Sequence, residues 1–197
     1  GPLLFRGQDI HHATLGLVGL GRIGSEMAKR ARGFDMRVRY FDPQPRKDLE
    51  QRLGIEYASL ETILKESDFV SLHVSLDAGT KHYIGEKELR MMKPTAYLIN
   101  TSRGPVIDEQ ALVHALREGW IAGAGLDVYE YEPLLMPGLS GLDNAVVCPH
   151  IASATMQTRD DMATLAAENL IAALKGEKPP TIVNPEVLNA PNLRKLL

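Results

Sequence analysis

The stretch Thr14-Leu-Gly-Leu-Val-Gly-Leu-Gly-Arg-Ile-Gly24 is the most informative part of this 197-residue sequence. It begins as a short apolar run, typical of a buried strand, and leads into an amphipathic segment over residues 23–32. Between the two, Gly19 permits a tight turn, Gly21 lets the backbone approach a pyrophosphate, and Gly24 lets helix and strand pack closely. The stretch therefore predicts a dinucleotide-binding loop at a helix N-terminus, and the alternative is a glycine-rich turn without a ligand.

An acidic residue, Asp42, ends the next apolar run, 18 positions after the last of these glycines. A carboxylate at that place accepts hydrogen bonds from both ribose hydroxyls of NAD and repels the additional phosphate of NADP. We therefore expect NAD(H) to be favoured over NADP(H). Arg39, Arg46 and Lys47 are close enough in sequence to weaken that preference, and Asp42 could instead be a turn residue before Pro43.

Apolar runs alternate with helix-patterned segments along most of the sequence. The runs cover residues 14–18, 36–41, 69–74, 96–100, 122–126 and 145–148, and their nearly continuous apolar residues are typical of parallel strands covered on both faces. Helices are expected over residues 23–32, 49–53, 60–66, 86–91 and 109–118, and a loop over 133–143. This alternation predicts an α/β fold, a Rossmann-type doubly wound parallel sheet with three αβα layers.

A different pattern begins after residue 155. One long extra helix is expected over residues 157–174, ended by Gly176 and the pair Pro179-Pro180. Its apolar face requires a partner surface, whereas the tail over residues 181–197 has too few apolar residues to form a domain. We therefore divide the sequence into a dinucleotide-binding domain, residues 1–155, and a C-terminal helix and tail, residues 156–197.

Composition argues against several classes of protein. The 22 basic and 25 acidic residues leave a formal net charge of −3, without the basic excess of a nucleic-acid-binding protein. Apolar residues make up 44%, the ordinary globular share, and no apolar stretch approaches the roughly 20 residues that cross a bilayer. The single cysteine, Cys148, and the lack of a secretory pattern predict a cytoplasmic protein, and no Cys/His spacing suggests a metal site.

Three segments that follow later apolar runs carry residues suited to catalysis. They contain, in order, Arg103, the acidic residues Glu130 and Glu132, and His150. Because ligands of an open α/β sheet bind beyond the carboxyl ends of its strands, all three segments should face the cofactor cleft. An arginine can hold a carboxylate in bidentate fashion, a histidine can exchange a proton near neutral pH, and a neighbouring glutamate can orient it. These residue types suit hydride transfer to or from a 2-oxo acid, although each residue alone could be structural and spacing does not choose between the two glutamates.

These segments resemble the NAD-binding domain of the D-isomer-specific 2-hydroxyacid dehydrogenases, especially their glyoxylate/hydroxypyruvate reductase branch. The resemblance covers about residues 7–188 and includes the glycine loop, an arginine motif over 100–105, a long signature over 118–129 and a histidine motif over 149–155. It implies that Arg103 binds the substrate and that His150 is the acid/base. It also implies that Glu132 is the partner of His150, since the family's Arg and Glu are separated by the same 29 positions as Arg103 and Glu132. Ser75 and Asp77 depart from the family, which commonly has proline and threonine there.

The same resemblance implies which residues contact the cofactor. Arg22 and Ile23 would contact the pyrophosphate, Val74 and Thr80 the adenosine half, and Asp127 the nicotinamide amide. The complete set of expected cofactor-binding residues is Gly19, Gly21, Arg22, Ile23, Gly24, Asp42, Val74, Thr80, Thr101, Ser102, Arg103, Asp127, His150, Ala152 and Ser153.

The resemblance implies an NAD-dependent oxidoreductase acting on CH–OH donors, or its cofactor-binding fragment. It would transfer hydride between NAD(H) and a small 2-hydroxy or 2-oxo acid such as glyoxylate or hydroxypyruvate. The family's substrate domain is built mainly from residues before the glycine loop, so the helix and tail would pack on a domain absent from this chain, which alone could be inactive. The alternatives are a non-catalytic NAD-sensing module of the corepressor type and a phosphoglycerate dehydrogenase. We also expect a homodimer, with neither nucleic acid nor membrane as a partner.

Overall fold

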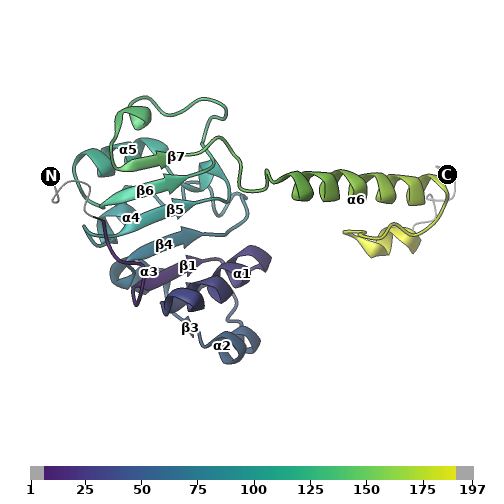
Figure 1. Cartoon of the computed structure of the whole chain (residues 1–197), viewed down its shortest axis with the longest axis horizontal. Helices are drawn as coiled ribbons and strands as arrows, with labels where there is room; N and C mark the ends of the chain where they lie inside the picture. The colour runs from purple at the N-terminus through teal and green to yellow at the C-terminus, as the bar shows by residue number, and fades with distance from the viewer. Residues whose placement is uncertain (1–6, 190–197) are drawn as a thin grey trace. The chain divides into compact units, whose positions relative to one another are not determined.

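The computed structural model describes residues 7–189 and contains a seven-stranded sheet in the order β3-β2-β1-β4-β5-β6-β7 (Figure 1). The strands are β1 (Thr14–Val18), β2 (Arg37–Phe41), β3 (Glu56–Tyr57), β4 (Phe69–Leu72), β5 (Tyr97–Asn100), β6 (Gly123–Leu126) and β7 (Ala145–Val147). Every neighbouring pair is parallel, which confirms the predicted doubly wound sheet. The strand order reverses between β1 and β4, and sheets of this kind bind ligands at that switch point.

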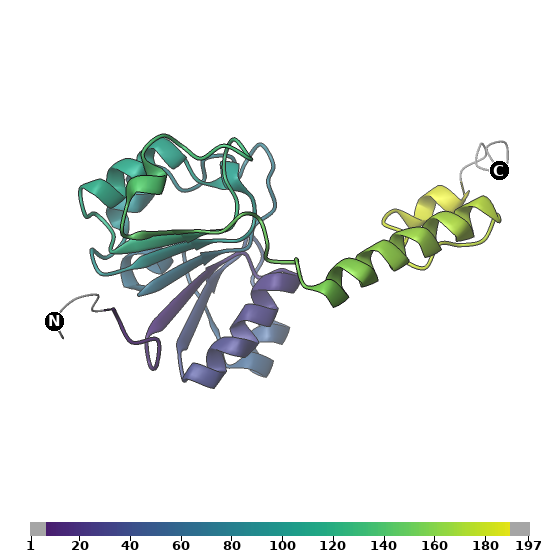
Figure 2. The ribbon, with the colours of Figure 1, turned by 45° about the horizontal axis from the view of Figure 1, so that its top comes forward.

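Helices cover the sheet on both faces (Figure 2). These helices are α1 (Arg22–Ala31), α2 (Lys47–Leu53), α3 (Leu60–Glu66), α4 (Glu86–Met91) and α5 (Glu109–Arg117), with short 3-10 helices at Arg32–Phe34, Gly104–Val106 and Leu139–Gly141. Later in the chain follow α6 (Met156–Leu174) and a 3-10 helix at Pro185–Asn189. One core contains residues of α1 and α2, such as Ala28 and Leu49, and a separate core contains residues of α3, α4 and α5, such as Ile63, Leu89 and Leu112. The predicted three-layer arrangement is therefore confirmed.

Local sequence explains where several of these helices begin and end. Ser59, Asp108 and Thr155 precede α3, α5 and α6, and each side chain accepts a hydrogen bond from a backbone N–H of the first turn. Gly54 ends α2 in the left-handed conformation, with φ of 65°. These caps satisfy backbone groups that have no partner inside the helix.

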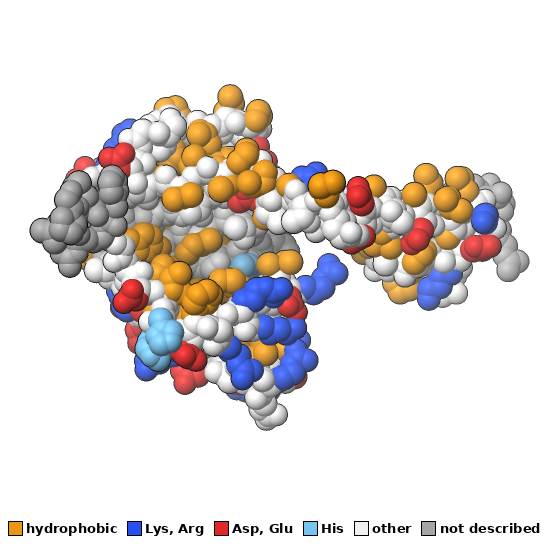
Figure 3. Space-filling view, viewed as in Figure 1, with side chains coloured by type: hydrophobic (Ala, Val, Ile, Leu, Met, Phe, Trp, Pro, Cys, Tyr) orange, Lys and Arg blue, Asp and Glu red, His pale blue; other side chains and the backbone are white. Residues whose placement is uncertain are grey.

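The two ends of the sheet differ in how well they are covered. Leu15 and Leu17 of the central strand β1 are 2% and 0% exposed, whereas Val146 of the edge strand β7 is 67% exposed. In Figure 3, hydrophobic side chains are visible on the side of the sheet that is turned toward the viewer. The β7 edge therefore presents apolar surface.

The chain divides into two compact units between His150 and Ile151. In the second unit, Asn169 of α6 binds the following tail, since its Nδ2 donates to Thr181 Oγ1 at 2.8 Å and its Oδ1 accepts from Thr181 N at 3.1 Å. The domain division expected after residue 155 stays a prediction, and residues 190–197 of the expected tail lie outside the described residues. Within residues 7–189, no helix combines the length and apolarity needed to cross a membrane.

The structure differs from the sequence-based expectations mainly at strand ends. The two-residue strand β3 was not predicted, because Glu56 and Tyr57 are both exposed and two residues show no periodicity. The strand expected over residues 69–74 ends at Leu72, so His73 and Val74 belong to the loop that follows.

Candidate active site

The glycine loop joins β1 to α1 and leaves room for a ligand. Gly19 has φ of 94°, and a Cβ built there would lie 2.8 Å from the backbone carbonyl of His73. A Cβ on Gly24 would lie 2.2 Å from Gly19 O, so α1 can approach the loop only because position 24 has no side chain. A Cβ on Gly21, in contrast, would meet no described atom within 4 Å. The start of α1 is therefore open where its backbone N–H groups could bind an anion.

Asp42 follows β2 and binds the glycine loop. Its Oδ2 accepts a hydrogen bond from Leu20 N at 2.9 Å, and its Oδ1 accepts one from Gln44 N at 3.2 Å. The carboxylate thus organises the turn that follows β2 and also stays beside the glycine loop. The two hypotheses for Asp42, a turn residue and a ribose ligand, are therefore compatible.

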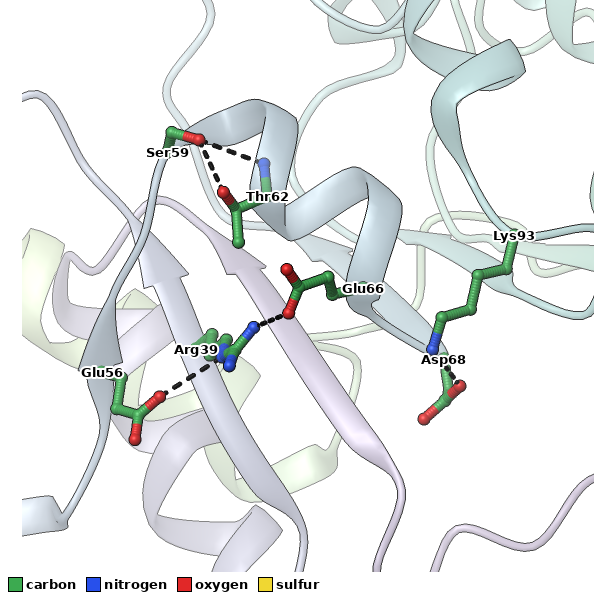
Figure 4. A network of polar contacts seen from close by, with 7 residues as sticks. All are labelled: Arg39, Glu56, Ser59, Thr62, Glu66, Asp68 and Lys93. Carbon is green, nitrogen blue, oxygen red and sulfur yellow. Dashed lines mark hydrogen bonds and ion pairs between the residues drawn. The ribbon is translucent and has the colours of Figure 1, made fainter.

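The three cations near Asp42 in sequence are all paired with carboxylates. Arg39 lies between Glu56 and Glu66 (Figure 4), with its Nε 3.3 Å from Glu56 Oε2 and its Nη1 bound to Glu66. The hydrogen bond with Glu66 is the largest cause of the raised pKa of Arg39. The other pairs are Arg46 with Asp48 at 3.2 Å and Lys47 with Glu50 at 2.9 Å.

A groove of about 460 Å³ lies between the start of α1 and the segments that follow β4 and β5. Its lining residues are Arg22, Ile23, His73, Val74, Ser75, Leu76, Thr101, Ser102 and Arg103, and six of them were expected to contact the cofactor. Burial lowers the pKa of His73 to about 4, so this imidazole is neutral at physiological pH. Thr80 is not part of this lining, and its Oγ1 donates to Ser75 O at 2.6 Å within the loop after β4.

Asn100, at the end of β5, shapes the loop that carries Arg103. The side chain is 1% exposed, its Nδ2 donates to Arg103 O at 2.9 Å, and its Oδ1 accepts from Ser102 N at 3.0 Å. The next residue, Gly104, lies so close to the segment after β6 that a Cβ would be 1.9 Å from the Tyr129 carbonyl. These two residues hold the arginine loop against the segment that carries the acidic candidates.

Glu132 and His150 are hydrogen-bonded to each other. Glu132 Oε2 lies 2.9 Å from His150 Nδ1, and Glu132 Oε1 accepts from Tyr129 N at 3.1 Å. The bond with His150 is the largest cause that lowers the pKa of Glu132, and the charge of Arg103 acts in the same direction. Glu132 is therefore ionised at neutral pH, and a carboxylate in this place orients the imidazole.

The backbone around His150 is held by Tyr129. Tyr129 Oη donates to Cys148 O at 2.5 Å, and His150 N donates to the same carbonyl at 3.1 Å. His150 itself has φ of 54°, a conformation that is uncommon outside glycine. Because Nδ1 is bound to Glu132, Nε2 is the ring nitrogen left to face a substrate.

Glu130, the competing acidic candidate, has a different partner. Its Oε1 lies 2.7 Å from His82 Nε2, and its side chain is 7% exposed. The fold thus separates the two glutamates that spacing alone could not separate, and Glu132 is the one that contacts His150.

A second cavity, of about 530 Å³, lies beside this pair. It is lined by Tyr129, Glu132, Pro133, Leu135, Val147, Cys148, Pro149 and His150. A small ligand in this cavity would meet the His–Glu pair at one side and an apolar wall at the other.

The remaining predicted cofactor residues are placed as follows. Asp127 follows β6, is 6% exposed, and donates through its backbone N to Asn100 O at 3.0 Å. Ala152 and Ser153 belong to the second unit. The roles expected for these three residues stay predictions.

Residues 2–152 match the family model of the D-isomer specific 2-hydroxyacid dehydrogenase, NAD binding domain. The chain belongs to this family. The resemblance inferred from its motifs is thereby confirmed, and most of the first unit is the NAD-binding domain of a D-isomer specific 2-hydroxyacid dehydrogenase.

The chain is similar to several dehydrogenases and reductases along most of its own length. The chain is 56% identical over 189 residues to a glyoxylate reductase of Thermococcus litoralis, a match that covers 96% of the chain and 57% of that protein. A crystal structure of a glyoxylate reductase from Paecilomyes thermophila is 44% identical with a TM-score of 0.83, covering 91% of this chain and 54% of that one. A crystal structure of a D-lactate dehydrogenase with NAD+ from Lactobacillus jensenii is 31% identical with a TM-score of 0.83. The match covers 93% of this chain and 59% of that one. The chain thus spans a little over half the length of these relatives.

Sequence reasoning missed several residues that shape the site of this dehydrogenase domain. Asn100, Gly104 and Tyr129 were quoted within motifs but given no role, and Glu109 was not considered. Gly104 directly follows Arg103, and a glycine at that place is a signal of close backbone approach. No sequence signal distinguishes the buried Glu109 from an exposed first-turn glutamate.

Proposed function

We propose that the protein carrying this chain is an NAD-dependent reductase of a small 2-oxo acid such as glyoxylate or hydroxypyruvate. The observation that carries the proposal is the 2.9 Å hydrogen bond between His150 Nδ1 and Glu132 Oε2. Arg103 and the glycine loop follow other strands of the same parallel sheet, so all of these groups lie toward its carboxyl edge. A domain that only bound a dinucleotide would need no oriented acid/base pair.

The residues of the first groove fit NAD(H). The position of Gly21 is open, the N-terminus of α1 offers backbone N–H groups, and Asp42 stays beside the loop. We favour NAD(H) over NADP(H) because the Asp42 carboxylate would repel the additional phosphate. Arg39, Arg46 and Lys47, which could have neutralised that phosphate, are engaged by carboxylates.

The chemistry assigns one task to each of three side chains. Arg103 would hold the substrate carboxylate by charge-assisted hydrogen bonds. Bound NADH would supply the hydride that reduces the carbonyl carbon. His150, in its protonated form, would give the Nε2 proton to the carbonyl oxygen, so that the product is a 2-hydroxy acid. Glu132 would keep the ring turned and stabilise its charge until that proton leaves.

Two further expectations belong to this proposal. A homodimer is supported by the exposed valines of β7, since an apolar edge strand favours association. Sedimentation equilibrium that gave a monomer mass at every concentration would contradict it. A cytoplasmic location remains a prediction from the single cysteine.

The test offers glyoxylate, hydroxypyruvate and phosphohydroxypyruvate in turn to the complete natural polypeptide, and follows the loss of NADH absorbance. We expect turnover with one of the first two acids. A clear preference for phosphohydroxypyruvate would instead indicate a phosphoglycerate dehydrogenase. Tight NADH binding without turnover of any of the three would indicate an NAD-sensing module. The same assay on the 197-residue chain tests whether its own residues are sufficient for turnover.

A further inference from the structure

A buried carboxyl group lies at the start of α5, outside both cavities of the candidate site. Glu109 is 2% exposed, and its Oε1 accepts a hydrogen bond from the backbone N of Glu130 at 2.8 Å. The other oxygen, Oε2, is buried and has no hydrogen-bond partner among the residues that the structure describes. A buried polar atom without a hydrogen bond destabilises the folded state, so we expect a role of Glu109 that offsets this cost.

Helix capping does not supply that reason. The N-cap of α5 is Asp108, whose Oδ1 already accepts from Ala111 N at 3.0 Å. A glutamate in the first turn normally points into water, where it still interacts with the helix dipole. Burial raises the pKa of Glu109, and the charges of Glu130 and Glu132 act in the same direction.

The partner of Glu109 is part of the segment that carries Glu132. Glu130 N lies two residues before Glu132, and a Cβ on Gly104 would be 2.5 Å from that nitrogen. Glu130 is also held by its side chain, through the 2.7 Å contact with His82. From Tyr129, hydrogen bonds reach Glu132 Oε1 and the carbonyl of Cys148, which binds His150 N.

We propose that Glu109 is a positioning residue for the Glu132–His150 pair. By accepting the hydrogen bond of Glu130 N, it holds residues 129–132 at the place where Glu132 reaches the imidazole. Glu109 lines neither cavity, and its described side-chain hydrogen bond joins it to the backbone of the segment that carries Glu132. This inference rests on the function proposed above.

The first test compares Glu109→Leu with Glu109→Gln in the complete natural polypeptide. Leucine removes the acceptor at similar volume and leaves Glu130 N unsatisfied, whereas glutamine keeps an oxygen for that bond. We expect kcat for glyoxylate reduction to fall about tenfold in Glu109→Leu, the effect of one buried hydrogen bond left unmade. We expect an unchanged KM for NADH in both variants and a kcat close to that of the parent in Glu109→Gln.

The second test needs no turnover. In protein labelled with ¹⁵N, the ring-nitrogen NMR signals of His150 report its contact with Glu132. We expect the Nδ1 signal of Glu109→Leu to move toward its position in Glu132→Gln, and that of Glu109→Gln to stay at the parent position. Failure of the parent to reduce any 2-oxo acid would overturn the proposed function, and the imidazole signal would still decide the role of Glu109.

The matched control is Glu86→Gln on α4. Glu86 is exposed, and its only described side-chain partner is Arg90 at 2.9 Å. This substitution should leave both kcat and the His150 signal unchanged. If Glu109→Leu does not fold, Glu109→Asp replaces it, since the acid is kept but its reach is one methylene shorter. Aspartate is expected to lower kcat and shift the His150 signal in the same directions. A variant with a lower melting temperature but the parental kcat and His150 signal would overturn the inference, because Glu109 would then only stabilise the fold.

Discussion

The glycine-loop half of the sheet and the half that carries Arg103, Glu132 and His150 are built in different ways. In the first half, a strand, a turn and the start of a helix follow one another within residues 14–24, and the closest contact, Gly24 with Gly19, is local. In the second half, the three residues follow β5, β6 and β7, which are neighbours in the sheet, and Glu132 and His150 are hydrogen-bonded to each other. The glycine loop is thus formed by local contacts, whereas the Glu132–His150 pair depends on contacts between segments that are distant in the sequence.

The largest effect is expected from His150→Ala. Removing the acid/base should lower kcat about a thousandfold, the usual contribution of a positioned proton donor, while the Kd for NADH stays nearly unchanged. Stopped-flow or steady-state NADH oxidation measures the first quantity and NADH fluorescence titration the second. The control is His114→Ala on α5, which should retain parental turnover. Parental turnover in His150→Ala itself would show that His150 takes no part in the reaction. It would also contradict the assignment of proton transfer to the half of the sheet that carries His150.

Gly104→Ala should have the next largest effect, since its Cβ would lie 1.9 Å from the Tyr129 carbonyl. Either the arginine loop or the segment that leads to Glu132 must shift, and a displacement of about 1 Å at a catalytic group can cost about a hundredfold in rate. We expect kcat to fall by that order and the melting temperature to drop. Gly33→Ala, where a Cβ meets no described atom within 4 Å, is the control. A fall in NADH affinity larger than the fall in kcat would show that the segments after β5 and β6 also determine cofactor binding, so that the two halves of the sheet do not act independently.

Gly21→Ala tests the cofactor half alone. Because its Cβ would meet no described atom within 4 Å, the melting temperature should not change. The added methyl group stands where a pyrophosphate would approach, so we expect the Kd for NADH to rise about tenfold, a change of about 1.4 kcal/mol. Gly24→Ala is the contrasting variant, since its Cβ would lie 2.2 Å from Gly19 O and should lower the melting temperature as well. Unchanged NADH affinity in Gly21→Ala would contradict the proposed pyrophosphate site.

The smallest effect is expected from Asp42→Asn. The amide keeps an oxygen for Leu20 N or Gln44 N but has no charge to repel the additional phosphate of NADP. The ratio of kcat/KM for NADH to that for NADPH should therefore fall a few-fold, with the melting temperature close to that of the parent. Glu86→Gln, which removes the charge of an exposed carboxylate on α4, is the control. An unchanged ratio would mean that residues other than Asp42 determine the preference for NADH over NADPH.

Strand β3 and the two glutamates show what apolar periodicity and residue spacing alone leave undecided. Six of the seven strands and the helices of both layers follow from apolar periodicity, because each buries a face several residues long. Strand β3 has two exposed residues and is recognised only by its pairing with β2. Glu130 and Glu132 are two positions apart in one segment, yet they bind different histidines, His82 and His150.

Local patterns were enough for the α/β class and the glycine loop, because hydrophobic periodicity and glycine spacing act over a few neighbouring residues. The family followed from the resemblance of four motifs to those of known dehydrogenases. The Glu132–His150 contact joins residues 18 positions apart, and the Glu109–Glu130 bond joins residues 21 positions apart. Contacts of that kind depend on the order of the strands and on how closely two backbone segments approach. The family resemblance already implied Glu132 as the partner of His150, and the folded chain brings the two side chains into contact. The burial of Glu109 emerged only from the folded chain, where Gly104 lies against the segment after β6.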